Sequence, residues 1–294
     1  MNTQNSTPLG IFLRLLAATA VMFAAALSPI IFSILPYQRE INRGELFGGG
    51  SLGLLVSCAI MVIVCCVVTA VAYVLVRLLT TKWDRNPVSV LGLQLERRGL
   101  TWCLAMVATA FIIAATGTIV LQLIGVRGDP VELSGDTWWA KIILMFAVGV
   151  LMQGMPEEII WRGWLMSSIS DPRKAAFLSV TVFALLHLVS GGGQENLLEH
   201  FIYLAAPFGL AFAAAMTRLA THSTWPAIGI HGGFHLANLL ALFMPVESGP
   251  ERWLFDGVAW VCVGLFIAWR CNIFHQLDAH RQHSAIDCTP VNVR

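Results

Sequence analysis

Long runs of apolar residues constrain the fold of this chain more than any other feature of its sequence. A helix needs about 20 apolar residues to cross a bilayer. Only 12% of the 294 residues are charged and the mean hydropathy is +0.73, whereas a soluble domain carries about 25% charged residues. The sequence therefore predicts an all-α, polytopic transmembrane helical bundle of about eight spans. We expect them at residues 15–35, 52–79, 100–124, 138–158, 174–189, 197–220, 223–244 and 253–269.

The distribution of basic residues predicts how the bundle is oriented. Lysine and arginine concentrate between the second and third spans, at Arg173-Lys174, at Arg218 and in the C-terminal tail, whereas the intervening loops are acidic. Because basic loops stay in the cytoplasm, we expect both termini there. The Glu157 end of the fourth span is then expected at the cytoplasmic face.

We expect one structural domain, since no linker or internal repeat divides the chain. Residues 1–137 form N-terminal transmembrane helices without a recognisable motif. Residues 138–245 form a core that carries the polar motifs, and residues 246–294 hold the last span and a polar tail. The net charge of +1 gives no reason to expect a nucleic-acid partner. The seven cysteines contain no CxxC pair, so neither a disulfide framework nor a thiolate zinc site is indicated.

Two adjacent carboxylates follow the apolar part of the fourth span, in Met155-Pro156-Glu157-Glu158. Ionisable groups inside a membrane are rare and usually mark a functional site. Glu158 and Arg162 are four residues apart, which places them on one helix face as a structural ion pair. Glu157 points elsewhere and is the free carboxylate.

Three histidines lie in later spans. His187 follows Phe183 near the end of the fifth, and His231 and His235 share one face of the seventh. Gly232 and Gly233 between them allow a helix or a substrate to approach closely. Glutamate and histidine can activate a water as general bases. Alternatively, Glu157, His187, His231 and His235 could ligate a zinc ion. There is no HExxH motif, and spacing alone does not choose between these chemistries.

These residues resemble the intramembrane proteases that include type II CAAX prenyl endopeptidases and bacteriocin-processing or self-immunity proteins, known as the CPBP or Abi family. The family motif E-E-x-x-x-R matches Glu157, Glu158 and Arg162, and F-x-x-x-H matches Phe183 and His187. The resemblance covers residues 138–245. It implies that Glu157 and His187 activate the attacking water and that His231 and the residue four later stabilise the oxyanion or the bound water.

The third motif departs from the family pattern. The family usually has asparagine four residues after the histidine, and this chain has His235. A histidine can also donate a hydrogen bond to an oxyanion or ligate a metal. Asn238, on the same helix face as His231, is a candidate substitute for oxyanion or substrate contact.

The leading hypothesis is an intramembrane endopeptidase that hydrolyses a peptide bond near the cytoplasmic membrane face. Its expected partners are the lipid bilayer and a peptide or membrane-protein substrate, with lipidation of the substrate left open. The alternatives are a catalytically silent scaffold or bacteriocin self-immunity protein, favoured by His235, and a transporter, for which no inverted repeat is seen. We expect a multi-pass protein of the bacterial plasma membrane.

Overall fold

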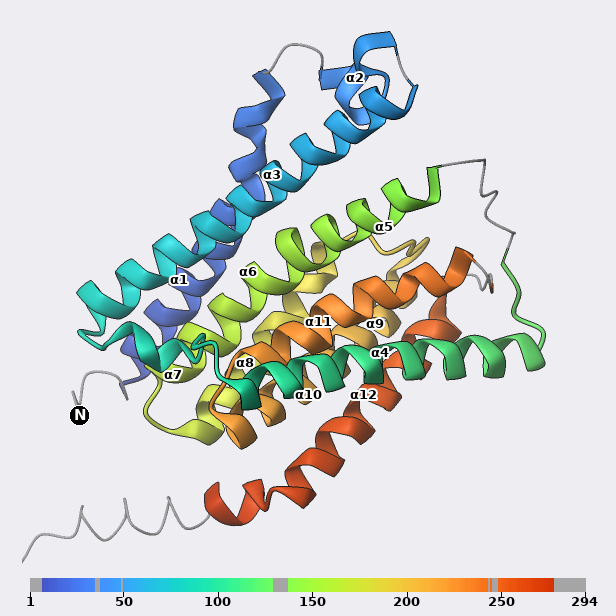
Figure 1. Ribbon diagram of the computed structural model, residues 1–294. Helices are drawn as coiled ribbons and strands as arrows, with labels where there is room; N and C mark the ends of the chain where they lie inside the picture. Colours follow the sequence, from blue (N-terminus) through green and yellow to red (C-terminus); the bar gives the residue numbers. More distant parts are fainter. Residues whose placement is uncertain are drawn as a thin grey trace, which may run out of the picture.

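The protein is a bundle of helices. The computed structural model describes residues 7–34, 38–48, 50–128, 137–242, 244 and 248–277, and this part of the chain contains no strand (Figure 1). Within it, seven helices are long and apolar enough to cross a membrane. The predicted all-α, polytopic bundle is therefore confirmed. The seven are Pro8–Phe32, Gly50–Trp83, Arg97–Leu123, Trp138–Ser168, Pro172–Val189, Leu197–Thr221 and Pro250–Arg270.

The remaining predicted span, residues 223–244, contains a shorter helix. This helix, α11 (Trp225–Ala237), has 13 residues and continues as a 3-10 turn at Asn238–Leu242. Most of its residues are buried, because it packs against α4 (Arg97–Leu123) and α10 (Ala205–Thr221). α11 is therefore a central element of the bundle. Because other helices surround it, its length need not match the thickness of the membrane.

Glycines let neighbouring helices approach α11 closely. A Cβ atom at Gly229 would lie 2.4 Å from the Cys103 carbonyl oxygen of α4. A Cβ atom at Gly154, in the fourth span, would lie 2.9 Å from the Gly232 nitrogen. The close approach predicted for the glycines beside His231 is thus made by helices on both sides. These contacts fix where the α11 histidines lie.

Replacing Gly229 with alanine is expected to destabilise the protein by about 1–3 kcal/mol, because the added methyl group meets backbone atoms that cannot rotate away. The unfolding midpoint in detergent measures the effect. Gly191→Ala is the matched control, since a Cβ atom there meets nothing within 4 Å. Equal midpoints for the two variants would contradict this packing.

The fourth span is one continuous helix, Trp138–Ser168, with no break at Gly154 or Pro156. It consists of α5 (Trp138–Phe146), a π-helical stretch (Ala147–Gly154), α6 (Met155–Glu158), a second π-helical stretch (Ile159–Leu165) and α7 (Met166–Ser168). Proline has no backbone N–H to donate to the preceding turn, and the π-helical stretch before Pro156 accommodates this without a break. π-helical turns inside α-helices are frequent at functional sites.

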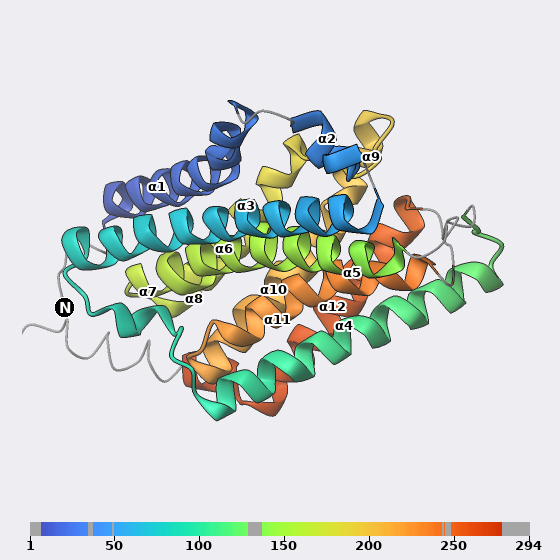
Figure 2. The same cartoon turned by 45° about the horizontal axis from the view of Figure 1, so that its top comes forward.

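The two glutamates lie inside this span, which corrects their predicted position at its end. The helix continues beyond Glu157 to Ser168, a further distance of about 16 Å. The prediction was wrong because it ended the span at the first charges. These charges have partners within the protein, described below, so the helix can carry them through the bundle. α3 (Gly50–Leu78) packs along the span (Figure 2), and Thr69 of α3 donates a hydrogen bond to the Leu151 carbonyl.

One end of the bundle, here called the basic end, is formed by the connections at residues 79–96, 169–171 and 222–224. Thr224 donates to the Leu91 carbonyl through Oγ1 at 2.7 Å and to the Gly92 carbonyl through its backbone N–H at 2.8 Å. Arg218 of α10 donates to the Val90 carbonyl at 2.7 Å. These bonds fasten the start of α11 to the connection that precedes α4.

Arg14 also lies near the basic end, but inside the first helix and not before it as predicted. It is buried in α1 (Pro8–Leu27), and its Nη2 is 2.5 Å from Asp84 Oδ1. Trp164 donates to the other Asp84 oxygen at 2.7 Å. The buried carboxylate of Asp84 is the partner that allows an arginine within this apolar helix.

The opposite end, here called the cavity end, is where α4 and α8 (Pro172–Leu186) end. α9 (Leu197–Tyr203) and α12 (Pro250–Arg270) begin there. The predicted sixth span is divided at Leu204 into α9 and α10. Most of the predicted acidic loop at 126–137 and the polar tail after residue 277 lie outside the described residues. The predicted cytoplasmic position of both termini stays a prediction.

Candidate active site

Glu158 and Arg162 form a buried ion pair. Arg162 Nη1 lies 3.1 Å from Glu158 Oε1, and both side chains are 0% exposed. The spacing of four residues brings them to one helix face, and the guanidinium carbon lies 4.5 Å from the centre of the Phe183 ring. Arg218 holds the same turn by donating to the Arg162 carbonyl at 2.9 Å. The pair is therefore part of the framework of the bundle.

His231 connects this pair to the second glutamate. Its Nδ1 lies 3.0 Å from Glu158 Oε1, and its Nε2 lies 4.0 Å from Glu157 Oε2. An ionised carboxylate only accepts hydrogen bonds, so Nδ1 of His231 carries the proton in this contact. The other ring nitrogen of His231, Nε2, faces Glu157.

Glu157 is the less engaged of the two glutamates. Its side chain is 22% exposed, whereas that of Glu158 is 0% exposed. Within the described part of the chain, the buried Oε2 atoms of both glutamates have no hydrogen-bond partner, but Glu158 is held through Oε1 by Arg162 and His231. A buried polar atom without a partner is unusual and calls for an explanation such as a missing water or a catalytic role.

His187 lies where α8 ends and is fixed by its own helix. Its Nδ1 is 2.8 Å from the Phe183 carbonyl oxygen. A carbonyl oxygen only accepts, so Nδ1 is the donor and Nε2 carries the lone pair in the neutral ring. The local hydrogen bond therefore prepares Nε2 to accept a proton.

Phe183 is the packing centre that joins these groups. Its ring centre lies 4.7 Å from that of His187 and 5.9 Å from that of His231. Trp161 meets it edge-on at 6.1 Å. This accounts physically for a phenylalanine four residues before the histidine, because one ring supports Arg162 and both histidines.

His235 stacks on His231, with ring centres 5.2 Å apart and an angle of 29° between the planes. The absence of a side chain at Gly149 makes room for it, since a Cβ atom there would lie 2.5 Å from the His235 Cβ. Asn238 lies one turn further along, at the end of α11, and is exposed.

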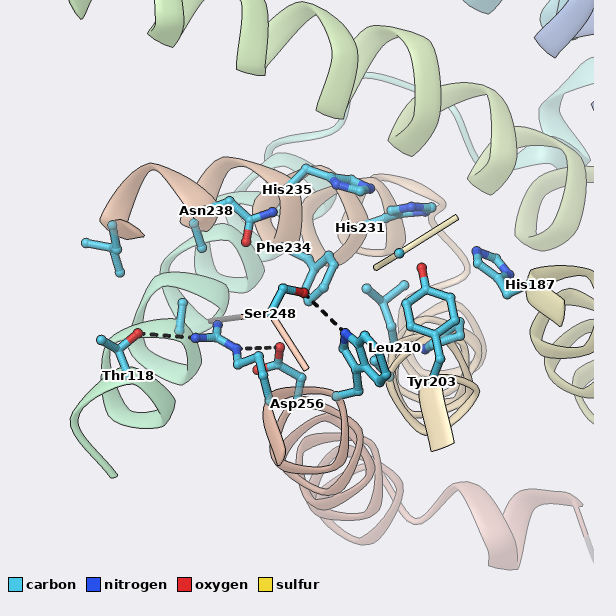
Figure 3. A pocket seen from close by; sticks show the side chains of 18 of the residues that line it. Thr118, His187, Tyr203, Leu210, His231, Phe234, His235, Asn238, Ser248 and Asp256 are labelled. Atoms are coloured by element: carbon cyan, nitrogen blue, oxygen red, sulfur yellow. Dashed lines mark hydrogen bonds and ion pairs between the residues drawn. The ribbon is translucent and has the colours of Figure 1, made fainter. Parts of the chain in front are cut away.

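A cavity of about 390 Å³ brings three of the predicted residues together with Asn238. His187, His231 and His235 lie at its inner part, and Asn238 lines it further out (Figure 3). Glu157, Glu158 and Arg162 are not among its lining residues. The two glutamates are connected to the cavity through His231, which contacts both of them.

Sequence reasoning missed several residues that line this cavity. Tyr203 points its hydroxyl toward the histidines (Figure 3), and its ring centre is 6.5 Å from that of His187. Arg252 binds Asp256 at 2.8 Å and Thr118 at 3.2 Å. The spacing of four between Arg252 and Asp256 was the one sequence signal for this group.

The donors do not fit the alternative of a zinc site. Among the residues that the structure describes, no group of three or more His, Cys, Asp or Glu side chains is placed to hold a metal ion. Zinc needs three protein ligands converging on one point, and Glu157, His187, His231 and His235 are not arranged in that way.

Residues 138–237 match the family described as type II CAAX prenyl endopeptidase, Rce1-like. Over these residues the chain is Rce1-like. The match confirms the resemblance stated for residues 138–245 and contains every predicted site residue except Asn238. The likeness is at the level of the family and covers about a third of the chain, and the multi-pass bundle is in keeping with it. No curated protein and no solved structure matches the chain.

Proposed function

We propose that the Rce1-like core hydrolyses a peptide bond inside the membrane, with a water activated by Glu157 and His187. One observation carries this proposal: the Glu157 carboxylate, which no arginine or lysine of the described residues pairs and whose buried Oε2 atom accepts no hydrogen bond, lies beside His231, one of the histidines that line a single cavity. The other carboxylate of the pair, Glu158, is engaged by both Arg162 and His231. The base is therefore assigned to Glu157.

The reaction begins with proton transfer from water to the Glu157 carboxylate, assisted by Nε2 of His187. The water oxygen bonds to the substrate carbonyl carbon and gives a tetrahedral oxyanion. The C–N bond then breaks, and the proton taken from water passes to the leaving amine. General acid–base catalysis of this kind contributes about 10²–10⁴-fold.

His231 and His235 stabilise the oxyanion in this scheme. A second proton on Nε2 makes His231 a donor, and the nearby Glu157 and Glu158 balance the resulting charge. His235, stacked on it, presents a second N–H to the same cavity. Donors placed where negative charge develops are usually the largest single contribution to acyl-transfer catalysis.

No step of this reaction involves a metal, because no group of His, Cys, Asp or Glu side chains among the described residues is placed to hold one. We therefore expect a zinc chelator to leave the rate unchanged. A transporter or a silent scaffold remains the competing class, and the mutations below separate them. The chain is an integral, multi-pass membrane protein, and we propose the bacterial plasma membrane as its location.

The experiment that tests this function is cleavage of fluorogenic peptides by the purified protein in detergent. The panel includes peptides with and without a lipidated cysteine, because the substrate class is open. The proposal expects cleavage that is unaffected by chelator and lost in His187→Ala. His200→Ala, a histidine outside the cavity lining, is the control and is expected to keep the rate. Cleavage that persists in His187→Ala would refute the assigned mechanism.

The residue that departs from the family pattern gives a separate prediction. His235→Asn is expected to retain activity, because the amide also donates a hydrogen bond. His235→Ala is expected to lower kcat by about 10²–10³-fold, the effect of removing one oxyanion donor. Equal kcat values for the alanine variant and the unaltered protein would remove His235 from the catalytic set.

A further inference from the structure

The cavity beside the histidines leads toward the cavity end of the bundle. His231 forms its inner part, whereas Asn238, Ser248 and Gly192 lie further out. Arg252, near the start of α12, and Thr118, near the end of α4, line the same space. All of these outer residues belong to the end where α4 and α8 end and α9 and α12 begin (Figures 1 and 3).

The basic end is closed over the same site. Every residue from Ile159 to Leu165 is buried, and Leu91 is 0% exposed. Arg218 bonds both to the Arg162 carbonyl and to the connection at Val90. A substrate approaching from that end meets packed protein before it reaches Glu157.

The two ends differ in charge. Most basic residues in and around the connections lie at the basic end: Arg77, Lys82, Arg85, Arg97, Arg98, Arg173, Lys174 and Arg270. At the cavity end, the helix starts carry Glu195, Glu199 and Glu251, and Arg252 is paired with Asp256. Among the described residues, this end also carries the four basic residues Arg39, Arg43, Arg127 and Lys141, against the five glutamates Glu40, Glu45, Glu195, Glu199 and Glu251. Positive charge near helix ends is retained in the cytoplasm, so the basic end is the cytoplasmic one.

We propose that the catalytic cavity opens to the non-cytoplasmic side of the membrane, and that its substrate is an extracytoplasmic segment of a membrane or exported polypeptide. This reverses the expected cleavage near the cytoplasmic face. That expectation assumed that the substrate reaches Glu157 from the basic end of the bundle. In the structure, the basic end is the closed one. The substrate class rests on the proposed peptidase function, whereas the direction of opening rests on packing and charge alone.

Labelling of single cysteines in intact cells tests the direction of opening. Glu195→Cys and Glu96→Cys are matched probes, because both glutamates are exposed and they lie at opposite ends. Asn238→Cys reports on the cavity itself. The native cysteines are first replaced, and a membrane-impermeant maleimide is applied before and after permeabilisation.

Glu195→Cys and Asn238→Cys are expected to react in intact cells, and Glu96→Cys only after permeabilisation. The reverse pattern would overturn the proposal. A second arm adds an impermeant fluorogenic peptide to intact spheroplasts, with Glu157→Gln as the blank. Cleavage that requires permeabilisation would refute the extracytoplasmic substrate. If the cysteines are labelled as expected but the peptide is cleaved neither before nor after permeabilisation, the direction of opening is still supported. That result would count against the peptidase function instead.

Discussion

Replacing Glu157 with glutamine is expected to slow peptide hydrolysis by about 10²–10⁴-fold, the contribution of a positioned general base. Glutamine keeps the shape of the side chain but cannot accept a proton at neutral pH. Among the described residues, no arginine or lysine forms an ion pair with Glu157 that this variant would break. The unfolding midpoint is therefore expected to stay close to that of the unaltered protein. Initial rates on the cleaved peptide measure the effect.

Glu195→Gln is the matched control, because it makes the same chemical change at an exposed position in the α8–α9 connection. Its rate is expected to equal that of the unaltered protein. If Glu157→Gln keeps its rate while folding normally, the base has been assigned to the wrong residue.

Replacing Arg162 with methionine is expected to destabilise the protein by about 3–5 kcal/mol, because it leaves a buried carboxylate without its cation. Glu158 is 0% exposed and retains only His231 as a partner. The contact between Arg162 and the Phe183 ring is lost as well. Thermal unfolding in detergent, together with the fraction of monodisperse protein, measures the result.

Arg43→Met provides the comparison for this variant. Arg43 lies 3.9 Å from Glu45, and the two side chains are 69% and 58% exposed. An exposed ion pair contributes about 1 kcal/mol or less. Arg162→Met as stable as Arg43→Met would contradict a framework role for the buried pair.

The features that could be predicted from the sequence are those set by local spacing. The membrane-spanning helices could be predicted from the apolar segments, because the length and hydropathy of a segment decide whether it can span a bilayer. The spacing of four residues placed Glu158 beside Arg162. The family motifs singled out His187 and His231 before any helix packing was known.

Contacts between distant segments could not be predicted in this way. Arg14 and Asp84 are far apart in the chain, and only the packing of α1 against the rest of the bundle makes Arg14 a buried residue. The bond from His231 to Glu158 likewise depends on how closely α11 approaches α6. The outer cavity residues Tyr203 and Arg252 carry no motif, so the cavity and its direction emerged only from the structure.

The measurement that tests the central claim most directly compares new peptide termini in cells that express the unaltered protein with those in cells that express Glu157→Gln at equal levels. Mass spectrometry of protein termini detects cleavage without requiring that the substrate be identified beforehand. The account predicts a set of termini that depends on Glu157 and lies in membrane or exported polypeptides. Identical sets of termini in the two strains would contradict an intramembrane peptidase and favour a membrane scaffold.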